Sequence, residues 1–206
     1  MRALTGALLN NILLSNTKLA RVYMLIAPVA LVLYFFGISV AAGFVPMVLL
    51  LGPSSATMEN SMTSFTTRWS AFENTWALHP FLMVLSRYIV YILMSALGLA
   101  LWILIPFPFG DEVLVNMYGF GTFMFVVMAQ LSCAVYYPIM YLLNPRQDNV
   151  GIIAIFVSFG VAIALTWLIA SMFDNNLLVV AFVAVLYAVS FVLACAFNAM
   201  HRGRVS

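Results

Sequence analysis

The side chains that most often carry chemistry are few in this chain and lie far apart. The histidines are His79 and His201, and the cysteines are Cys133 and Cys195. No Gly-x-Ser-Gly or His-Glu-x-x-His motif is present, and no Gly-rich loop ending in Gly-Lys-Ser/Thr could hold ATP phosphates. The cysteines lack the CxxC spacing of a metal or redox site. We therefore expect no catalytic residue, metal or cofactor, and no enzymatic activity in this chain.

The charged residues also disfavour ion- or proton-coupled transport. Such carriers place an ionisable side chain at membrane depth, where its cost requires a functional reason. All six acidic residues are predicted in loops or at span borders, and no basic residue is predicted deeper than Arg87. If the chain moves a solute, we expect the energy to come from another subunit. No basic patch for nucleic acid remains, because membrane topology accounts for the basic residues.

Composition indicates an integral membrane protein. Of 206 residues, 66% are apolar and 7% are charged, whereas soluble domains are about half apolar and a quarter charged. The apolar residues form continuous runs rather than alternating ones, which favours helices over a barrel. A spanning helix needs about 20 apolar residues. We therefore predict an all-α membrane protein in which residues 1–206 form a single transmembrane domain.

Six apolar blocks are predicted to span the membrane. They cover residues 22–40, 42–58, 82–105, 113–141, 150–173 and 177–200. Only Ala41–Gly43 separates the first two blocks, so one kinked span is the alternative there.

The basic residues favour six spans over five. With six spans and a cytoplasmic N-terminus, all eight fall on the cytoplasmic side, while the opposite loops hold Asp111, Glu112 and Asp174. This is the asymmetry of the positive-inside rule. Five spans would divide the basic residues between the two sides. We therefore predict a multi-pass protein of the cell membrane with both termini in the cytoplasm.

Two segments outside the spans are predicted to be amphipathic. Residues 3–20 are predicted to form a helix at the membrane surface, and the alternative is an extension of the first span. The cytoplasmic segment Glu59–Phe81 carries Phe65, Trp69, Phe72 and Trp76 on one helical face. This aromatic face could lie on the membrane or dock in a groove on a soluble partner. The residues alone leave both interpretations open.

Small residues and a proline inside the spans have a predicted structural role. Close helix packing is expected at five glycines, namely Gly98, Gly119, Gly121, Gly151 and Gly160. Pro138 is expected to kink the fourth span, which could serve a gate.

Two short stretches carry a resemblance to a known family. Glu59 is followed by Trp69 and Phe72 and then by the stretch Val84–Tyr88, which reads Val-Leu-Ser-Arg-Tyr. At the end of the fourth span, Tyr137–Tyr141 reads Tyr-Pro-Ile-Met-Tyr and is soon followed by a basic residue. With these features the chain resembles the small six-span permease subunits of type 2 ABC exporters, found mainly in Gram-positive bacteria.

The resemblance implies partners and residue roles. Two permease chains, alike or different, would pair in the bilayer, and each would dock one ATP-hydrolysing subunit. The segment around Arg68–Trp76 would be the coupling helix. The partner-coupling residues would be Glu59, Arg68, Trp69, Phe72, Glu73 and Trp76. The residues that anchor spans would be Arg87, Tyr88 and Arg146.

The function expected from these features is export of an apolar or amphipathic cargo, such as a drug, peptide or lipid. Two alternatives belong to other classes. One is a non-transport membrane scaffold or immunity protein, which needs no ATPase. The other is an ion-coupled secondary carrier, whose flux would depend on a proton gradient.

Overall fold

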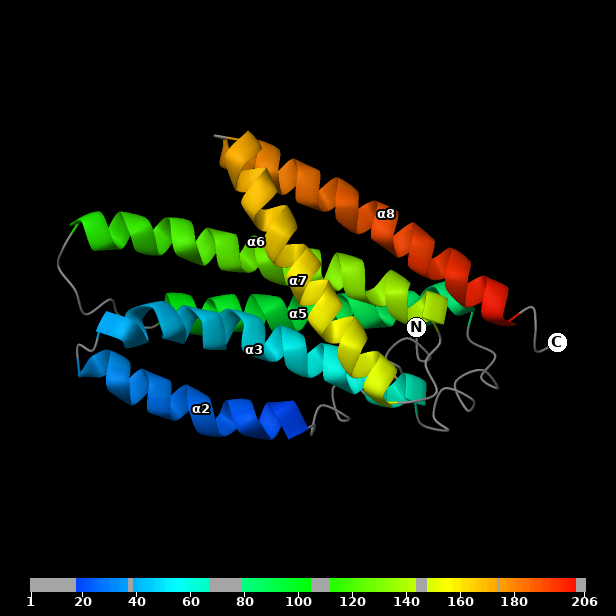
Figure 1. The fold of residues 1–206 in the computed structure, drawn as a ribbon, viewed down its shortest axis with the longest axis horizontal. Coiled ribbons are helices and arrows are strands. Elements are labelled where there is room, and N and C mark those ends of the chain that lie inside the picture. Colours follow the sequence, from blue (N-terminus) through cyan, green and yellow to red (C-terminus); the bar gives the residue numbers. More distant parts are fainter. Residues whose placement is uncertain are drawn as a thin grey trace.

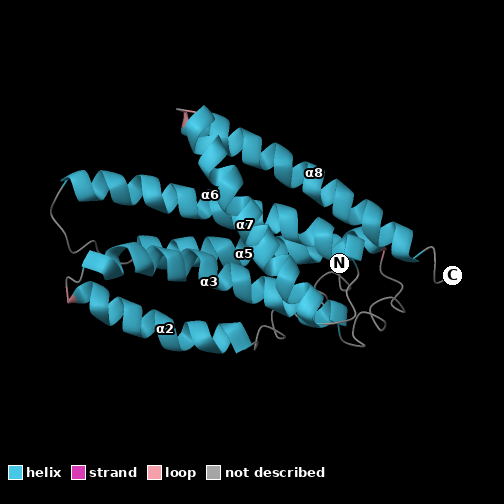
Figure 2. Cartoon of the chain, in the orientation of Figure 1, coloured by secondary structure: helices cyan, strands magenta, loops and turns pink. Residues whose placement is uncertain are grey.

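The computed structural model describes residues 18–36, 39–66, 79–104, 112–143, 148–173 and 175–202. Within these ranges all regular secondary structure is α-helical (Figure 2). The helices are α2 (Lys18–Phe35), α3 (Ser39–Thr66), α5 (Pro80–Ile103), α6 (Glu112–Leu143), α7 (Asp148–Met172) and α8 (Asn176–Arg202). Each helix runs opposite to its predecessor (Figure 1). By length and composition, α5, α6, α7 and α8 could each cross a membrane.

The last four predicted blocks match these helices closely. The predicted ends of the blocks differ from the ends of α5, α6, α7 and α8 by no more than two residues. At the start of α5, the Nδ1 atom of His79 accepts a hydrogen bond from the backbone N–H of Phe81 at 3.3 Å. Pro80 follows at the first helical position, where a missing N–H leaves no hydrogen bond unmade. His79 is thus a helix cap at the border of this span.

The boundary between the first two blocks was misplaced. Because α2 ends at Phe35 and α3 begins at Ser39, the predicted break at Ala41–Gly43 lies inside α3. The two helices are nevertheless separate, as the charge argument favoured. Residues 1–17, which hold most of the predicted surface helix, lie outside the described residues, and Lys18–Ala20 already belong to α2.

The helix that contains the second block does not end at Met58, where the block was predicted to end, because α3 continues to Thr66. Hydroxyl groups in the second half of α3 bond back to carbonyl groups of the same helix. Ser54 donates to Leu50 at 3.2 Å, and Ser55 donates to Leu51 at 2.9 Å. Both serines are buried. A helix can therefore keep polar residues away from lipid when other helices surround it.

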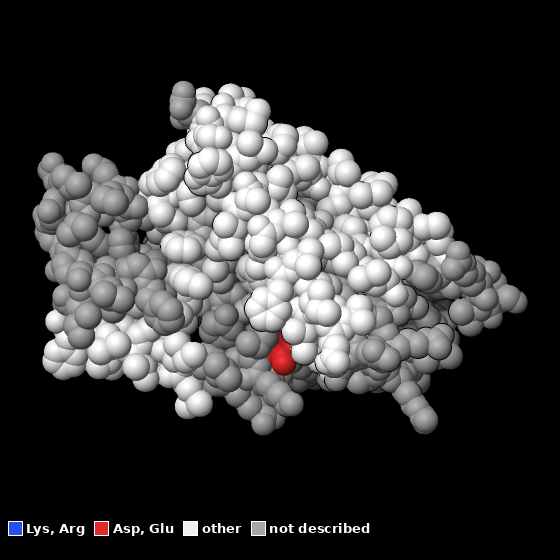
Figure 3. Space-filling view, in the orientation of Figure 1, with Lys and Arg blue, Asp and Glu red and all other residues white. Residues whose placement is uncertain are grey.

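Four helices surround α3, namely α2, α5, α6 and α7. The last helix, α8, packs against α6 and α5. Large apolar side chains remain exposed on the outer sides of α2, α7 and α8. The face in Figure 3 is almost free of charged side chains among the described residues. The described part of the chain is therefore a bundle with its polar helix inside and apolar surfaces outside.

Two of the five glycines lie at close helix contacts. A Cβ atom on Gly98 would overlap the backbone carbonyl oxygen of Leu49, and one on Gly151 would overlap the side chain of Met62. Around the other three there is open space, so the packing role predicted for them is wrong within this chain. These are Gly119, Gly121 and Gly160.

Candidate functional site

The candidate site is centred on Arg87, a charged residue buried inside the helix bundle. Its side chain is 3% exposed, and it lies seven residues after the start of α5. One guanidinium nitrogen, Nη2, donates to the Oγ atom of Ser64 on α3 at 2.9 Å. The guanidinium carbon lies 4.2 Å from the centre of the Phe65 ring and 5.5 Å from that of Tyr141. These contacts join the end of α3, the start of α5 and the end of α6.

The geometry suits an arginine better than a lysine. The guanidinium group is planar, more weakly hydrated than an ammonium group, and attracted to aromatic faces. The Phe65 and Tyr141 rings meet edge to face, with centroids 5.0 Å apart. The positive charge is therefore stabilised by two aromatic rings and a hydroxyl group.

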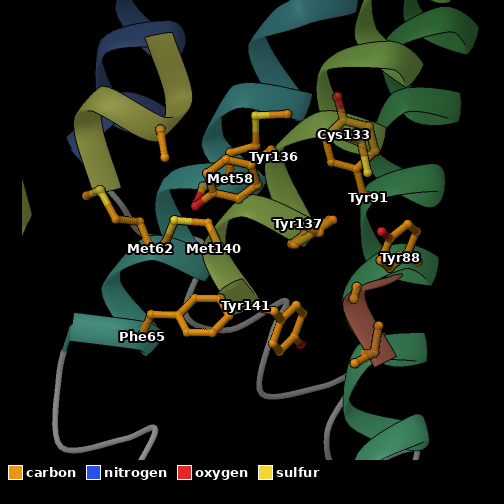
Figure 4. Packing of buried hydrophobic residues seen from close by; sticks show 13 residues of the cluster. Met58, Met62, Phe65, Tyr88, Tyr91, Cys133, Tyr136, Tyr137, Met140 and Tyr141 are labelled. Carbon is orange, nitrogen blue, oxygen red and sulfur yellow. The ribbon is translucent and has the colours of Figure 1, made fainter. Parts of the chain in front are cut away.

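Beside this charge lies a group of tyrosines that we call the tyrosine cluster. It consists of Tyr88, Tyr91, Tyr136, Tyr137 and Tyr141, from α5 and α6. Figure 4 shows these side chains packed with Met58, Met62 and Phe65 of α3. The Tyr88 and Tyr137 ring centroids are 4.9 Å apart, and those of Tyr136 and Tyr137 are 5.3 Å apart. The tyrosine cluster belongs to the largest of the three hydrophobic cores among the described residues.

Hydroxyl groups of the cluster bridge different helices. The Tyr136 hydroxyl donates to the Met58 carbonyl oxygen at 2.7 Å, which links α6 to α3. The Tyr88 hydroxyl and the Ser190 Oγ atom are 2.6 Å apart, which links α5 to α8. The Tyr137 hydroxyl lies 3.2 Å from the Oγ atom of Ser61 on α3. Buried tyrosines need such partners for their hydroxyl groups.

The contacts of this site hold helices in position. Among the described residues no group of three His, Cys, Asp or Glu side chains could hold a metal. An arginine stays protonated and so does not exchange protons. The site holds a fixed positive charge whose contacts join the end of α3, the start of α5 and the end of α6.

Only some of the predicted site residues come together here. Arg87 and Tyr88 lie side by side in the core, and Glu59 lies on α3, half-buried, directly after Met58. Pro138 is buried within α6, which continues through it to Leu143. The remaining predicted residues lie outside the described ranges, namely Arg68, Trp69, Phe72, Glu73, Trp76 and Arg146.

One prediction about this region needs correction. Phe65 was expected on an aromatic face that docks a membrane or a partner, but it is only 7% exposed and contacts Arg87. The correction arises because α3 continues as a buried helix past Met58. Arg87 lies near the start of α5, as predicted, and its side chain is buried between helices.

Several residues of the site were missed in the sequence. Ser61, Ser64, Tyr91 and Ser190 carry hydrogen bonds of the core. A usable signal was the spacing of Ser61, Ser64 and Phe65, which places all three on one face of a continuing helix.

Comparisons with protein-family models, curated proteins and solved structures find no match to the chain.

Proposed function

We propose that this chain is the membrane-spanning permease subunit of an ATP-driven exporter of an apolar or amphipathic cargo. One observation carries the proposal: the two stretches on which the resemblance rests pack against each other. Val84–Tyr88 lies in α5 and Tyr137–Tyr141 lies in α6, about 50 residues away. The Tyr137 hydroxyl donates to the Arg87 carbonyl oxygen at 3.5 Å, and the Arg87 guanidinium lies over the Tyr141 ring.

In the proposed mechanism, force from the ATPase enters through residues 67–78. This segment follows α3, whose Ser64 and Phe65 contact Arg87, and precedes α5, which carries Arg87 seven residues after its start. Trp69 and Phe72 would enter an apolar groove on the ATPase, and Arg68 or Glu73 would pair at its rim. Movement of the segment would then reach Phe65 and Arg87 and, through Tyr141, the end of α6.

The proposal includes six spans and two paired permease chains. The helices α2 and α3 would be the first two of these six spans, ahead of α5, α6, α7 and α8. Support for α3 comes from its burial, since polar residues at membrane depth are tolerated when they face protein rather than lipid. Support for a single cytoplasmic end comes from the antiparallel helix order, which directs the start of α2 and the end of α8 toward the same end of the bundle (Figure 1). Arg146 would lie at that end, just after α6, in a bacterial cell membrane.

The direct test removes the two aromatic side chains proposed to enter the ATPase. The full chain is first purified from its native membrane to recover the ATP-hydrolysing subunit. In the reconstituted complex, replacing both Trp69 and Phe72 with Ala should abolish the stimulation of ATP hydrolysis, because the docking contact is lost. Membrane insertion should be intact, since neither residue lies in a predicted span.

A matched control is Trp167→Ala, which removes an aromatic side chain that is 76% exposed on α7. It should leave the stimulation unchanged. Unchanged stimulation in the Trp69/Phe72 variant would reject the coupling role. Clean purification without any nucleotide-hydrolysing subunit would favour the scaffold or immunity alternative. A flux that stops with the proton gradient but persists without ATP would favour a secondary carrier.

A further inference from the structure

The middle of α3 combines several features that weaken a helix. Residues 52–57 read Gly-Pro-Ser-Ser-Ala-Thr, and glycine and proline are the two residues least suited to a helix interior. Pro53 has no N–H group, so it cannot donate the hydrogen bond that the Leu49 carbonyl oxygen would receive in an uninterrupted helix. The chain nevertheless remains helical on both sides of this turn. The backbone is therefore held by fewer hydrogen bonds here than in an ordinary turn of helix.

Hydroxyl groups bond to the carbonyl oxygens around this proline. Ser55 donates to the Gly52 carbonyl oxygen at 2.9 Å, and Thr57 donates to that of Pro53 at 2.7 Å. Bonds from serine and threonine to the preceding turn compete with the backbone bonds of a helix and often accompany a bend. They also give the carbonyl groups a partner when a backbone bond lengthens. This turn can therefore change shape without leaving polar groups unbonded inside the bundle.

The two halves of α3, before and after this turn, belong to different hydrophobic cores. The first half packs with α2 and α5 through residues such as Leu49 and Leu50. The second half packs with the tyrosine cluster through residues such as Met58 and Phe65 (Figure 4). The hydrophobic cores among the described residues include no side chain from residues 51–57. One half can therefore shift against the other without repacking a core that both share.

The contacts of the two halves also differ in kind. In the first half, the backbone of α3 meets the backbone of α5, because the Leu49 carbonyl oxygen leaves no room for a Cβ atom on Gly98. In the second half, a long side chain makes the link to α5, since Arg87 reaches Ser64 through its guanidinium group. A long side chain can follow a displacement by changing rotamer, whereas a backbone contact cannot. The first half is therefore the fixed one.

We propose that residues 52–57 of α3 form a hinge about which the second half of the helix bends while the first half stays fixed on α5. The second half is roughly 20 Å long at 1.5 Å per residue, so a kink of about 20° would displace its end by roughly 7 Å. In the proposed exporter, the hinge would let the end of α3 move with residues 67–78. The hinge itself does not depend on that function and can be measured without an ATPase.

The test measures distances between pairs of spin labels on cysteines, in the full chain without its native cysteines and in lipid nanodiscs. Thr63→Cys with Met200→Cys reports on the second half of α3, and Met47→Cys with Val185→Cys reports on the first half. All four positions are exposed. We expect the Thr63–Met200 distance distribution to be broader than the other by up to roughly 7 Å, the displacement that a 20° bend gives.

Pro53→Ala should narrow the broad distribution to the width of the other, because the restored N–H group can donate to the Leu49 carbonyl oxygen. The matched control is Pro28→Ala, which removes a proline from the interior of α2 and should leave the distribution broad. Circular dichroism and elution volume establish whether both variants are folded, and the comparison of the two label pairs in the unmodified helices needs neither variant.

Equal widths for the two label pairs would overturn the hinge. So would a distribution that stays broad in folded Pro53→Ala, since the motion would then belong to the helix ends. Either result would leave the proposed function standing, because stimulation of ATP hydrolysis is a separate measurement.

Discussion

At the scale of single residues, Arg87 is the least expected feature of the chain. A charge inside an apolar bundle is costly unless its surroundings compensate for it. Part of the compensation comes from the faces of Phe65 and Tyr141 and from the Ser64 hydroxyl. Because the partners come from α3 and α6, the same contacts that stabilise the charge also join three helices.

Removing the Arg87 side chain should destabilise the protein. We expect Arg87→Ala to lower the free energy of unfolding by about 2–4 kcal/mol, since a desolvated cation–π contact is worth about 2 kcal/mol and a hydrogen bond from a charged group about 1.5–3 kcal/mol. The measurement is unfolding of the purified chain in lipid bicelles.

Two variants separate the contribution of the planar guanidinium group to stability from that of its hydrogen bond to Ser64. Arg87→Lys keeps the charge but loses the planar face, so its loss should be intermediate. Ser64→Ala removes only the hydrogen bond and should cost about 1.5–3 kcal/mol, because the bond comes from a charged donor. Stability of Arg87→Ala equal to that of the unmodified chain would show that the charge is not held by these contacts.

At the scale of elements, α3 shows how a helix can be polar and still lie in the middle of a membrane-type bundle. Its hydroxyl groups bond to its own backbone, and four other helices cover it. On its other side α3 approaches α5 so closely that only glycine fits at position 98. Small residues allow this approach, which increases the dispersion contacts that drive helix association in lipid.

The close approach leads to a prediction about Gly98. We expect Gly98→Ala to lower the stability by about 1–3 kcal/mol, because the new methyl group would overlap the Leu49 carbonyl oxygen, and a backbone atom cannot move aside. Thermal unfolding in detergent, with helix content followed by circular dichroism, measures the change.

Gly160→Ala is the matched control, because no atom lies within 4 Å of the added carbon. It should be neutral or stabilising by up to about 1 kcal/mol, since alanine favours helix over glycine. Gly151→Ala should fall between the two, because the neighbouring Met62 side chain is flexible. Equal stability of the Gly98 and Gly160 variants would mean that α3 and α5 can separate without loss.

At the scale of the whole molecule, the exposed apolar surface of α7 and α8 defines the environment. Phe156 and Trp167 of α7 are 73% and 76% exposed, and Leu177 of α8 is 74% exposed. So large an apolar surface is not stable in water, but it matches lipid or a second membrane chain. The four long apolar helices therefore make a multi-pass membrane protein the consistent interpretation.

The number of spans can be tested with single cysteines in a chain lacking Cys133 and Cys195. An impermeant maleimide applied to intact cells should label Phe36→Cys, Asp111→Cys and Asn175→Cys, because six spans place all three positions outside. Thr67→Cys should be labelled only after the cells are opened. Labelling of Asp111→Cys and Asn175→Cys without Phe36→Cys would instead indicate four spans, with α2 and α3 not crossing.

Much of the architecture followed from the sequence. The length of each apolar run determined α5, α6, α7 and α8 to within two residues, because a helix in lipid must satisfy its own backbone and must be apolar over its whole length. Composition indicated a membrane protein rather than a soluble domain, and the distribution of the basic residues favoured separate α2 and α3 helices.

Only the tertiary structure decided what lies inside the bundle. The polar end of α3 was predicted to belong to a cytoplasmic amphipathic segment, since the sequence does not show that other helices bury Ser61 and Ser64. The depth of Arg87 and the meeting of Tyr88 with Tyr137 depend on contacts between residues more than 20 and about 50 positions apart. Local composition reports how a segment interacts with lipid or water, whereas burial of a polar side chain depends on which distant helix packs against it.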